Sequence, residues 1–403
     1  MKQTVKGVAG LLLILFSLNA TAQKPVQKRL SIDETIGVAK NNLQYGINAQ
    51  QINKGKEQVK TATMLPKTGV FAENEDFRPS DSKGILKIGL SQSMDWPGLY
   101  KAKKNLYNEQ LKYYEATTGT IEADLKRDIR SVYYQLWYLQ DKQQLFLRLD
   151  SIYRSLSAAA ILKVKTGDSR GLDSIAANVR MAELQALLQQ IGSDINIQQQ
   201  SLSQLVNSKD EMLPLVQPLE KLSIPSLLTD SLHPLLALQS QHINISNAGV
   251  SVIKNENKPD FSGRFFSQRL WGASDPFTGF SVTASFPLFG ASAYRSKVKT
   301  AQAEVLLQQK EFEYQQQLFN TQQLQMQKEM ERNSSLLSFY EKSGLKQAEE
   351  IIKAASLAYR AGEISFAELS QFLTQAIDIQ KNYLEVLNTY NQSVIQYNYF
   401  INK

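Results

Sequence analysis

The chain has 403 residues, a formal net charge of +7 at pH 7, two histidines and no cysteine. The lack of cysteine excludes disulfide bonds, a lipidated cysteine and thiolate metal sites, and two imidazoles leave any transition-metal site to carboxylates. The basic excess is spread along segments that also carry Gln and Glu, without a block of Lys or Arg, so nucleic-acid binding has little support. Because the sequence contains neither a phosphate-binding Gly-rich loop nor a G-x-S-x-G motif, we expect no enzyme activity and no cofactor.

The N-terminal stretch has the pattern of an export signal. Lys2 and Lys6 precede an apolar run at residues 8–18, and residues 20–22 form an A-x-A cleavage pattern. The alternative, a membrane anchor, is disfavoured because the run is too short to span about 30 Å of hydrocarbon. We therefore expect residues 1–22 to be a signal peptide, and we expect no membrane-spanning helix after it.

The next part of the chain predicts a helix, a hairpin and a very long helix. Ser31 and Glu34 form a capping-box pattern, which predicts a helix over residues 30–64. Residues 66–96 predict a hairpin whose returning strand, from Ile85, alternates apolar residues with small or polar ones. No proline follows Pro97 until Pro214. The stretch after Pro97 therefore predicts a helical segment of roughly 70 residues, about 100 Å long if fully helical.

The same order of patterns recurs in the second half. Residues 259–287 predict a second hairpin, and another proline-free helical segment follows it. A shift of 190 residues places Pro97 on Pro287, and a shift of 195 places Gly167 on Gly362, so the second segment is five residues longer. The apolar seam after Gly362 also recurs, in the same frame, after Gly167. An ordinary buried helix face would explain the spacing but not its recurrence, so we favour an internal duplication.

The predicted organisation is a signal peptide (1–22), a first repeat with helix, hairpin and long helices (23–206), an irregular, proline-containing linker or equatorial segment (207–234) and a second repeat of the same kind (235–403). The fold class that this predicts is mainly α, with long helical hairpins and a smaller β portion.

The two hairpins supply four strands with one apolar and one polar face. The apolar face is formed by Leu90, Met94, Trp96, Phe261, Phe265, Phe280 and Phe286. A strand in hydrocarbon must have every backbone group paired, so only a closed barrel is stable there. Four strands cannot close around a lumen, whereas three copies would supply twelve strands, enough for an aqueous channel. The competing interpretation, a small soluble β-subdomain, is disfavoured by the serines, lysine and glycines opposite the aromatics.

These features, taken in order, resemble the TolC-type outer-membrane efflux family over essentially the whole mature chain. They are the signal peptide, the Leu-Ser-Ile-Asp-Glu-Thr-Ile opening at residues 30–36, Leu65-Pro66 before the first hairpin, the twice-repeated strand, proline and long helix, and the glycine turns followed by a heptad-like helix. No single motif is specific. The resemblance implies a homotrimer with a twelve-stranded barrel in the lipid of the outer membrane and an α-helical tunnel through the periplasm. The tunnel would dock on a periplasmic adaptor (membrane fusion) protein and an inner-membrane pump of the resistance-nodulation-division type.

The resemblance also assigns roles to individual residues. Gly167 and Gly362 match the helix-turn-helix tips that face the adaptor. Asp173 and Glu368, six residues past each glycine, match acidic positions that line the periplasmic entrance, where a threefold ring of carboxylates would favour cations. Tyr359 matches a tyrosine at the tip.

One position departs from the family pattern. The arginine that links neighbouring tip helices in some members is Ile364 here, so that latch is absent or is supplied by another residue, such as Arg170. Residues 92–98 resemble a short stretch of the heavy-metal branch, which favours a metal cation slightly over a drug as the exported substrate. The leading hypothesis is thus a passive exit duct for metal cations or small toxic compounds. The alternative is a periplasmic coiled-coil scaffold or tether with no channel, which would share the heptads but has no use for amphipathic hairpins.

Overall fold

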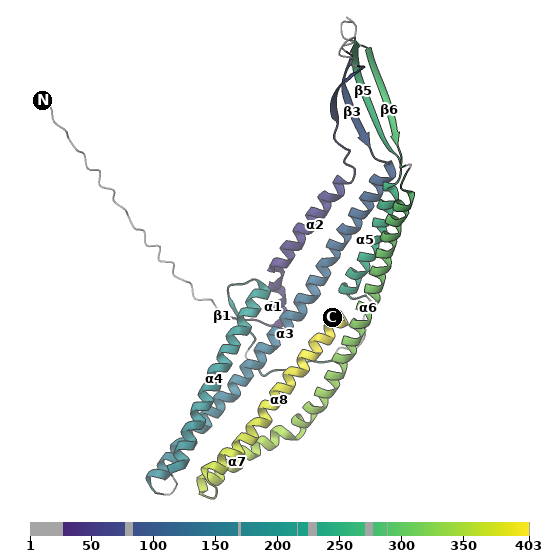
Figure 1. Cartoon of the computed structure of the whole chain (residues 1–403). Coiled ribbons are helices and arrows are strands. Elements are labelled where there is room, and N and C mark those ends of the chain that lie inside the picture. The colour runs from purple at the N-terminus through teal and green to yellow at the C-terminus, as the bar shows by residue number, and fades with distance from the viewer. Residues whose placement is uncertain are drawn as a thin grey trace, which may run out of the picture.

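The structure is a computed structural model that describes residues 27–76, 84–167, 171–215, 217–224, 232–270, 277–287 and 289–402. Long helices run side by side as an elongated, bent bundle, with a β-sheet at one end and the turns after α3 and α7 at the other (Figure 1). The mainly helical architecture that the sequence predicts is therefore confirmed. The expected signal peptide lies outside the described residues.

The first half contains β1 (Gln27–Arg29), α1 (Ile32–Val38), a 3-10 turn (Ala39–Asn41), α2 (Leu43–Thr61), β2 (Gly69–Glu75), β3 (Ile85–Met94), α3 (Pro97–Lys165) and α4 (Gly171–Val206). The capping box that starts α1 is present: Glu34 N–H donates to Ser31 Oγ, and Ser31 N–H donates to Glu34 Oε2. The single helix predicted over residues 30–64 is wrong. Asn42 interrupts it, because its side chain accepts a hydrogen bond from Gln44 N–H, which starts α2, and donates one to Leu205 O on α4.

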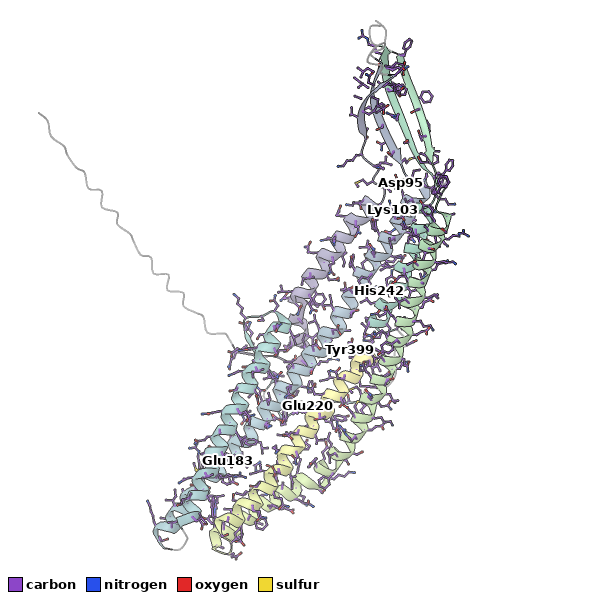
Figure 2. All side chains as sticks on the ribbon, in the orientation of Figure 1. Asp95, Lys103, Glu183, Glu220, His242 and Tyr399 are labelled. Carbon is purple, nitrogen blue, oxygen red and sulfur yellow. The ribbon has the colours of Figure 1, made fainter. Side chains whose placement is uncertain are left out.

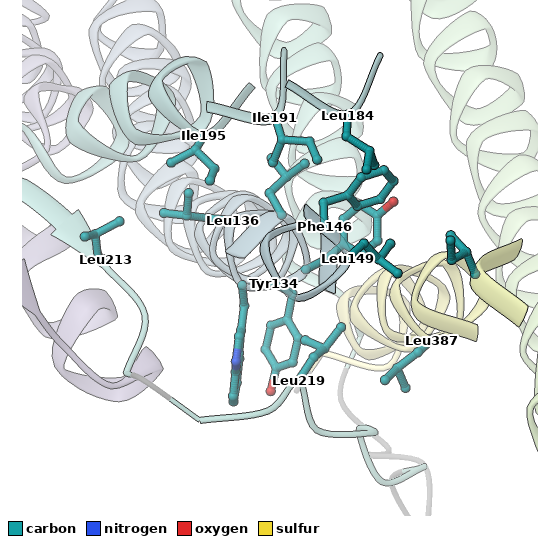
Figure 3. Packing of buried hydrophobic residues seen from close by; sticks show 14 of the residues in the cluster. Tyr134, Leu136, Phe146, Leu149, Leu184, Ile191, Ile195, Leu213, Leu219 and Leu387 are labelled. Carbon is teal, nitrogen blue, oxygen red and sulfur yellow. The ribbon is translucent and has the colours of Figure 1, made fainter. Parts of the chain in front are cut away.

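Helix α3 is the longest helix described and spans 69 residues, close to the length that the sequence predicts. It begins at Pro97, whose fixed φ suits the first helical position and whose missing N–H would have no helical partner there. Apolar residues of α3 pack against α4 and α8 and against the segment after α4 (Figure 3). The buried residues labelled there are Tyr134, Leu136, Phe146 and Leu149 of α3, Leu184, Ile191 and Ile195 of α4, Leu213 and Leu219 of the following segment, and Leu387 of α8. Within the described residues, no helix has the length and apolar composition needed to cross a membrane.

The second half contains β4 (Glu211–Leu213), α5 (Pro234–Glu256), β5 (Asp260–Leu270), β6 (Phe277–Ser285), α6 (Ala291–Phe339), a π-helical turn (Tyr340–Gly344), α7 (Leu345–Ala361) and α8 (Phe366–Phe400). Its long arm is thus interrupted by the π-helical turn, whereas α3 is continuous. A π-turn takes up one residue more than an α-turn. Since α3 begins at Pro97 itself and α6 only at Ala291, four of the five extra residues precede the helix, and the π-turn accounts for the fifth.

Both predicted hairpins join one antiparallel sheet in the order β2-β3-β5-β6. Val70, Leu90, Phe265 and Phe280 are neighbours in register across the four strands. Since side chains alternate along a strand, this register places the predicted apolar residues on one face of the sheet and their neighbours in sequence on the other. A second, parallel pair, β1-β4, joins the N-terminal strand to the segment after α4.

The segment at residues 217–222, within the predicted linker, is hydrogen-bonded to helices of both halves. Trp137 Nε1 on α3 donates to Gln217 O at 2.6 Å, and Leu219 N–H donates to the Asp141 carboxylate at 2.7 Å. On α8, the buried Asn391 side chain donates to the carbonyl of residue 220 at 2.8 Å and accepts from the N–H of residue 222 at 2.9 Å. The segment therefore joins α3 to α8 midway along the bundle, through backbone groups that bond to side chains of both helices.

Candidate functional site

The end of the bundle opposite the sheet contains both predicted tip glycines. Gly167 and Gly362 have φ values of +80° and +81°, in the left-handed region that favours glycine. At the second tip, Gly362 N–H donates to Tyr359 O at 3.2 Å and Glu363 N–H donates to Ala358 O at 2.9 Å, which is a Schellman motif. A Cβ at either glycine would meet nothing within 4 Å. The backbone angle, rather than a lack of room, therefore calls for glycine at both tips.

Two carboxylates follow the tips, each in the first turn of a helix, where the helix dipole favours negative charge. Glu368 Oε2 accepts hydrogen bonds from the N–H and Oγ of Ser365, both at 2.8 Å, and completes a capping box at the start of α8. These bonds lower the pKa of Glu368, which is exposed. Asp173 occupies the matching place at the start of α4.

One predicted gate residue is buried at the end of α7, where its hydroxyl lies within electrostatic reach of another, Asp173 of α4. Tyr359, at the end of α7, is 2% exposed, and its ring packs edge-on against Phe366 with centroids 5.9 Å apart. Burial raises the pKa of the Tyr359 hydroxyl, and the nearby Asp173 carboxylate raises it further. Glu368 is exposed rather than packed with this pair. Arg170 lies outside the described residues.

A link between the two helical hairpins, which the sequence did not single out, lies close to the tips. Arg180 of α4 donates to Glu183 Oε2 at 2.6 Å and to Thr374 Oγ1 of α8 at 2.5 Å. Ile364, where some family members have arginine, packs against the apolar core instead. The only sequence signal was an i,i+3 charge pair, which is common on helix surfaces. Glu183 marks this level of the bundle in Figure 2.

Between α4 and α8, next to Arg180, lies a groove of about 990 Å³. Leu172, Ile175 and Val179 line it and are 60–70% exposed. The part of the chain that the structure describes holds no group of three or more His, Cys, Asp or Glu placed to bind a metal ion.

At the other end of the bundle, the sheet exposes large apolar side chains. Leu90, Phe265 and Phe280, which are neighbours in register, are 52%, 60% and 81% exposed. Met94 and Phe261 pair further along the same face.

Two of the residues predicted for this face lie beyond the strand ends. β3 ends at Met94, and Trp96 precedes α3 with its ring stacked on Phe261 at 6.1 Å. Phe286 follows β6 and is 57% exposed.

Helices α2 and α4 lie on the opposite side of the bundle from α6 (Figure 1), and both sides expose apolar residues. The flank formed by α2 and α4 exposes Leu43 and Ile47 of α2, and the flank formed by α6 and α7 exposes Leu306, Leu307, Tyr314 and Leu324 of α6 and Leu357 of α7. Large exposed apolar surfaces of this kind mark interfaces with another protein or with a membrane.

Comparisons with known proteins agree with this geometry at the level of fold. No protein-family model matches the sequence, and a search of curated proteins finds no match. Solved structures do match. CusC, described in connection with transmembrane channel formation, is 13% identical, with a TM-score of 0.76 over 95% of both chains.

Two further channels show the same likeness. The Campylobacter jejuni CmeC outer membrane channel is 12% identical, with a TM-score of 0.77 over 92% of this chain and 85% of that one. The Neisseria gonorrhoeae MtrE outer membrane channel, in its open state, is 13% identical, with a TM-score of 0.71 over 92% and 88% of the two chains. The chain therefore has the fold of the TolC-type outer-membrane channels.

Proposed function

We propose that the chain is the outer-membrane channel of a tripartite efflux pump, a passive exit duct with a large periplasmic portion. The observation that carries the proposal is the sheet, with an exposed apolar face, a charged opposite face and β2 and β6 as its outer strands. Every backbone group must be paired in hydrocarbon, so such a sheet is stable there only if its outer strands pair with those of other copies. Three copies close a barrel of twelve strands, with the apolar face toward lipid.

The helical flanks support the same ring. If each copy packs its α2/α4 flank against the α6/α7 flank of the next, the contact is head-to-tail. Such contacts close into a ring of three when neighbouring copies are related by a third of a turn. The exposed apolar residues of both flanks then become buried between copies. The two repeats, residues 23–206 and 235–403, each contribute one hairpin to the barrel and one to the tunnel.

The tips form the periplasmic entrance in this proposal. Gly167 and Gly362 turn the chain where a periplasmic adaptor docks, and an inner-membrane pump of the resistance-nodulation-division type delivers the cargo, metal cations or small toxic compounds. Asp173 and Glu368 supply negative charge at the entrance, and Tyr359, buried against Phe366, belongs to the same gate.

Fractionation and reconstitution test the proposal together. The full chain, expressed in a Gram-negative host, should be recovered in the outer membrane, extract as a trimer in mild detergent and form ion-conducting channels in a planar lipid bilayer. Recovery in the soluble periplasm, or outer-membrane trimers that never conduct, would contradict the exit duct and favour the channel-less scaffold.

A further inference from the structure

A row of alternating aromatic residues and glycines crosses the charged face of the sheet. Phe71 on β2, Gly89 on β3, Phe266 on β5 and Gly279 on β6 are neighbours in register. A Cβ at Gly279 would lie 2.8 Å from the tip of the Phe266 ring, and a Cβ at Gly89 would lie 2.7 Å from Phe266 Cβ. The Phe266 ring therefore lies flat over β6, in space that only glycine leaves open.

A cationic side chain lies over each aromatic ring of this row, and each cation forms an ion pair with a carboxylate. The guanidinium carbon of Arg264 lies 3.8 Å from the centroid of the Phe71 ring, and Arg264 is hydrogen-bonded to Glu73. Lys87 Nζ lies 5.5 Å from the Phe266 centroid and 2.5 Å from Glu75 Oε2.

Both carboxylates belong to β2, whereas Arg264 belongs to β5 and Lys87 to β3. Each ion pair therefore links two strands. Cation–π contact and ion pairing both hold a long side chain against the sheet. In agreement, the Lys87 and Arg264 side chains are only 18% and 34% exposed.

We propose that Glu73, Glu75, Lys87 and Arg264 form a charge-compensated belt on the wall of the channel lumen and determine the charge selectivity of the barrel. This inference rests on the proposed function, because the charged face lines the lumen only if the apolar face meets lipid. Two carboxylates and two cations per chain sum to zero, in one copy and in a ring of three. Selective channels concentrate counter-ions with walls of one charge sign. The compensated belt does not, so at its level the wall favours neither cations nor anions and leaves discrimination to the periplasmic tips.

The test is a pair of variants that unbalance the belt in opposite directions. Arg264→Gln leaves an unpaired carboxylate in each copy, so the K⁺ to Cl⁻ permeability ratio in a planar bilayer should rise, whereas Glu73→Gln should lower it. The double variant, Arg264→Gln with Glu73→Gln, should return to the wild-type ratio. We expect shifts of about two- to threefold in 0.1 M salt that largely vanish in 1 M salt, because the Debye length falls from about 10 Å to about 3 Å.

Arg269→Gln is the matched control. Arg269 lies on the same strand with the same charge, but its register partner Leu86 places it on the apolar face. The control should leave the permeability ratio unchanged. If the first pair fails to assemble as trimers in detergent, Lys87→Gln and Glu75→Gln make the same opposite changes at the second ion pair.

The bilayer experiment distinguishes failure of the belt from failure of the proposed function. If the wild-type chain conducts but neither member of a pair shifts the permeability ratio, or both shift it in the same direction, the belt is refuted while the channel stands. If the wild-type chain forms no channels, the proposed function fails, and the belt with it.

Discussion

Replacing Phe280 by arginine tests the assignment of the two faces of the sheet. Phe280 lies in the middle of β6, is 81% exposed and continues the apolar row through Phe265 and Leu90. In the proposed barrel its side chain meets hydrocarbon, where an arginine near the midplane costs about 2–4 kcal/mol. A trimer carries the substitution three times, so the assembled barrel loses about 6–12 kcal/mol, as much as the entire stability of many domains.

Thr283→Arg is the matched control for this substitution. Thr283 lies on the same strand but on the opposite face, and it pairs with Ser262, so the new side chain would enter a polar lumen. The assay is the amount of trimer in the isolated outer membrane, measured by quantitative blotting after mild-detergent extraction.

We expect Phe280→Arg to reduce the trimer at least about tenfold, since about 1.4 kcal/mol corresponds to a factor of ten. Thr283→Arg should remain close to wild type. Equal losses in both variants, or a greater loss in Thr283→Arg, would refute the assigned faces of the sheet.

Three further predictions concern the helices. Gly362→Val should lower stability by about 1–2 kcal/mol through the left-handed backbone angle, and Gly362→Asn by less, because asparagine tolerates that angle. Thermal unfolding in detergent measures both, and equal losses would contradict a purely backbone role. Glu368→Gln keeps the capping box with Ser365 but removes the charge, whereas Glu368→Ala removes both. If Glu368 lines the entrance, the channel should be cation-selective and be blocked by multivalent cations added on the periplasmic side. Both variants should weaken this selectivity and this block, but only the alanine variant should also lower the unfolding midpoint. Unchanged selectivity in both would remove Glu368 from the entrance. Because the pKa of Glu368 is lowered by its bonds to Ser365, the block in wild type should persist below the usual titration range of a glutamate. His233 caps α5 and is 4% exposed. Burial lowers the pKa of its imidazole, so the folded chain is more stable when this histidine is neutral. Stability should therefore be full above the unfolded histidine pKa and fall as the pH drops through it. His233→Asn, which keeps a cap but does not titrate, should show a smaller loss between pH 7.5 and pH 5 in the same unfolding assay.

Several features followed from the sequence because they depend on local chemistry. The period-two alternation around Leu90 and Phe280 assigned residues to faces of the sheet, since a strand points successive side chains in opposite directions. The absence of proline after Pro97 predicted α3, because each backbone N–H could find its helical partner. Gly362, a glycine at a predicted helix tip, has the positive φ that a residue without a side chain tolerates.

Tertiary contacts decided the rest. Asn42 ends one helix and starts another partly because its side chain reaches Leu205, 163 positions along the chain, a contact that no sequence window contains. The register that sets Phe71, Gly89, Phe266 and Gly279 in one row depends on how the two hairpins pair, and alternation alone allows any even shift of one against the other. Sequence patterns thus determined the elements and their faces, because those depend on near neighbours. Only the folded chain determined which faces, charges and rings meet, because that depends on packing between segments remote in sequence.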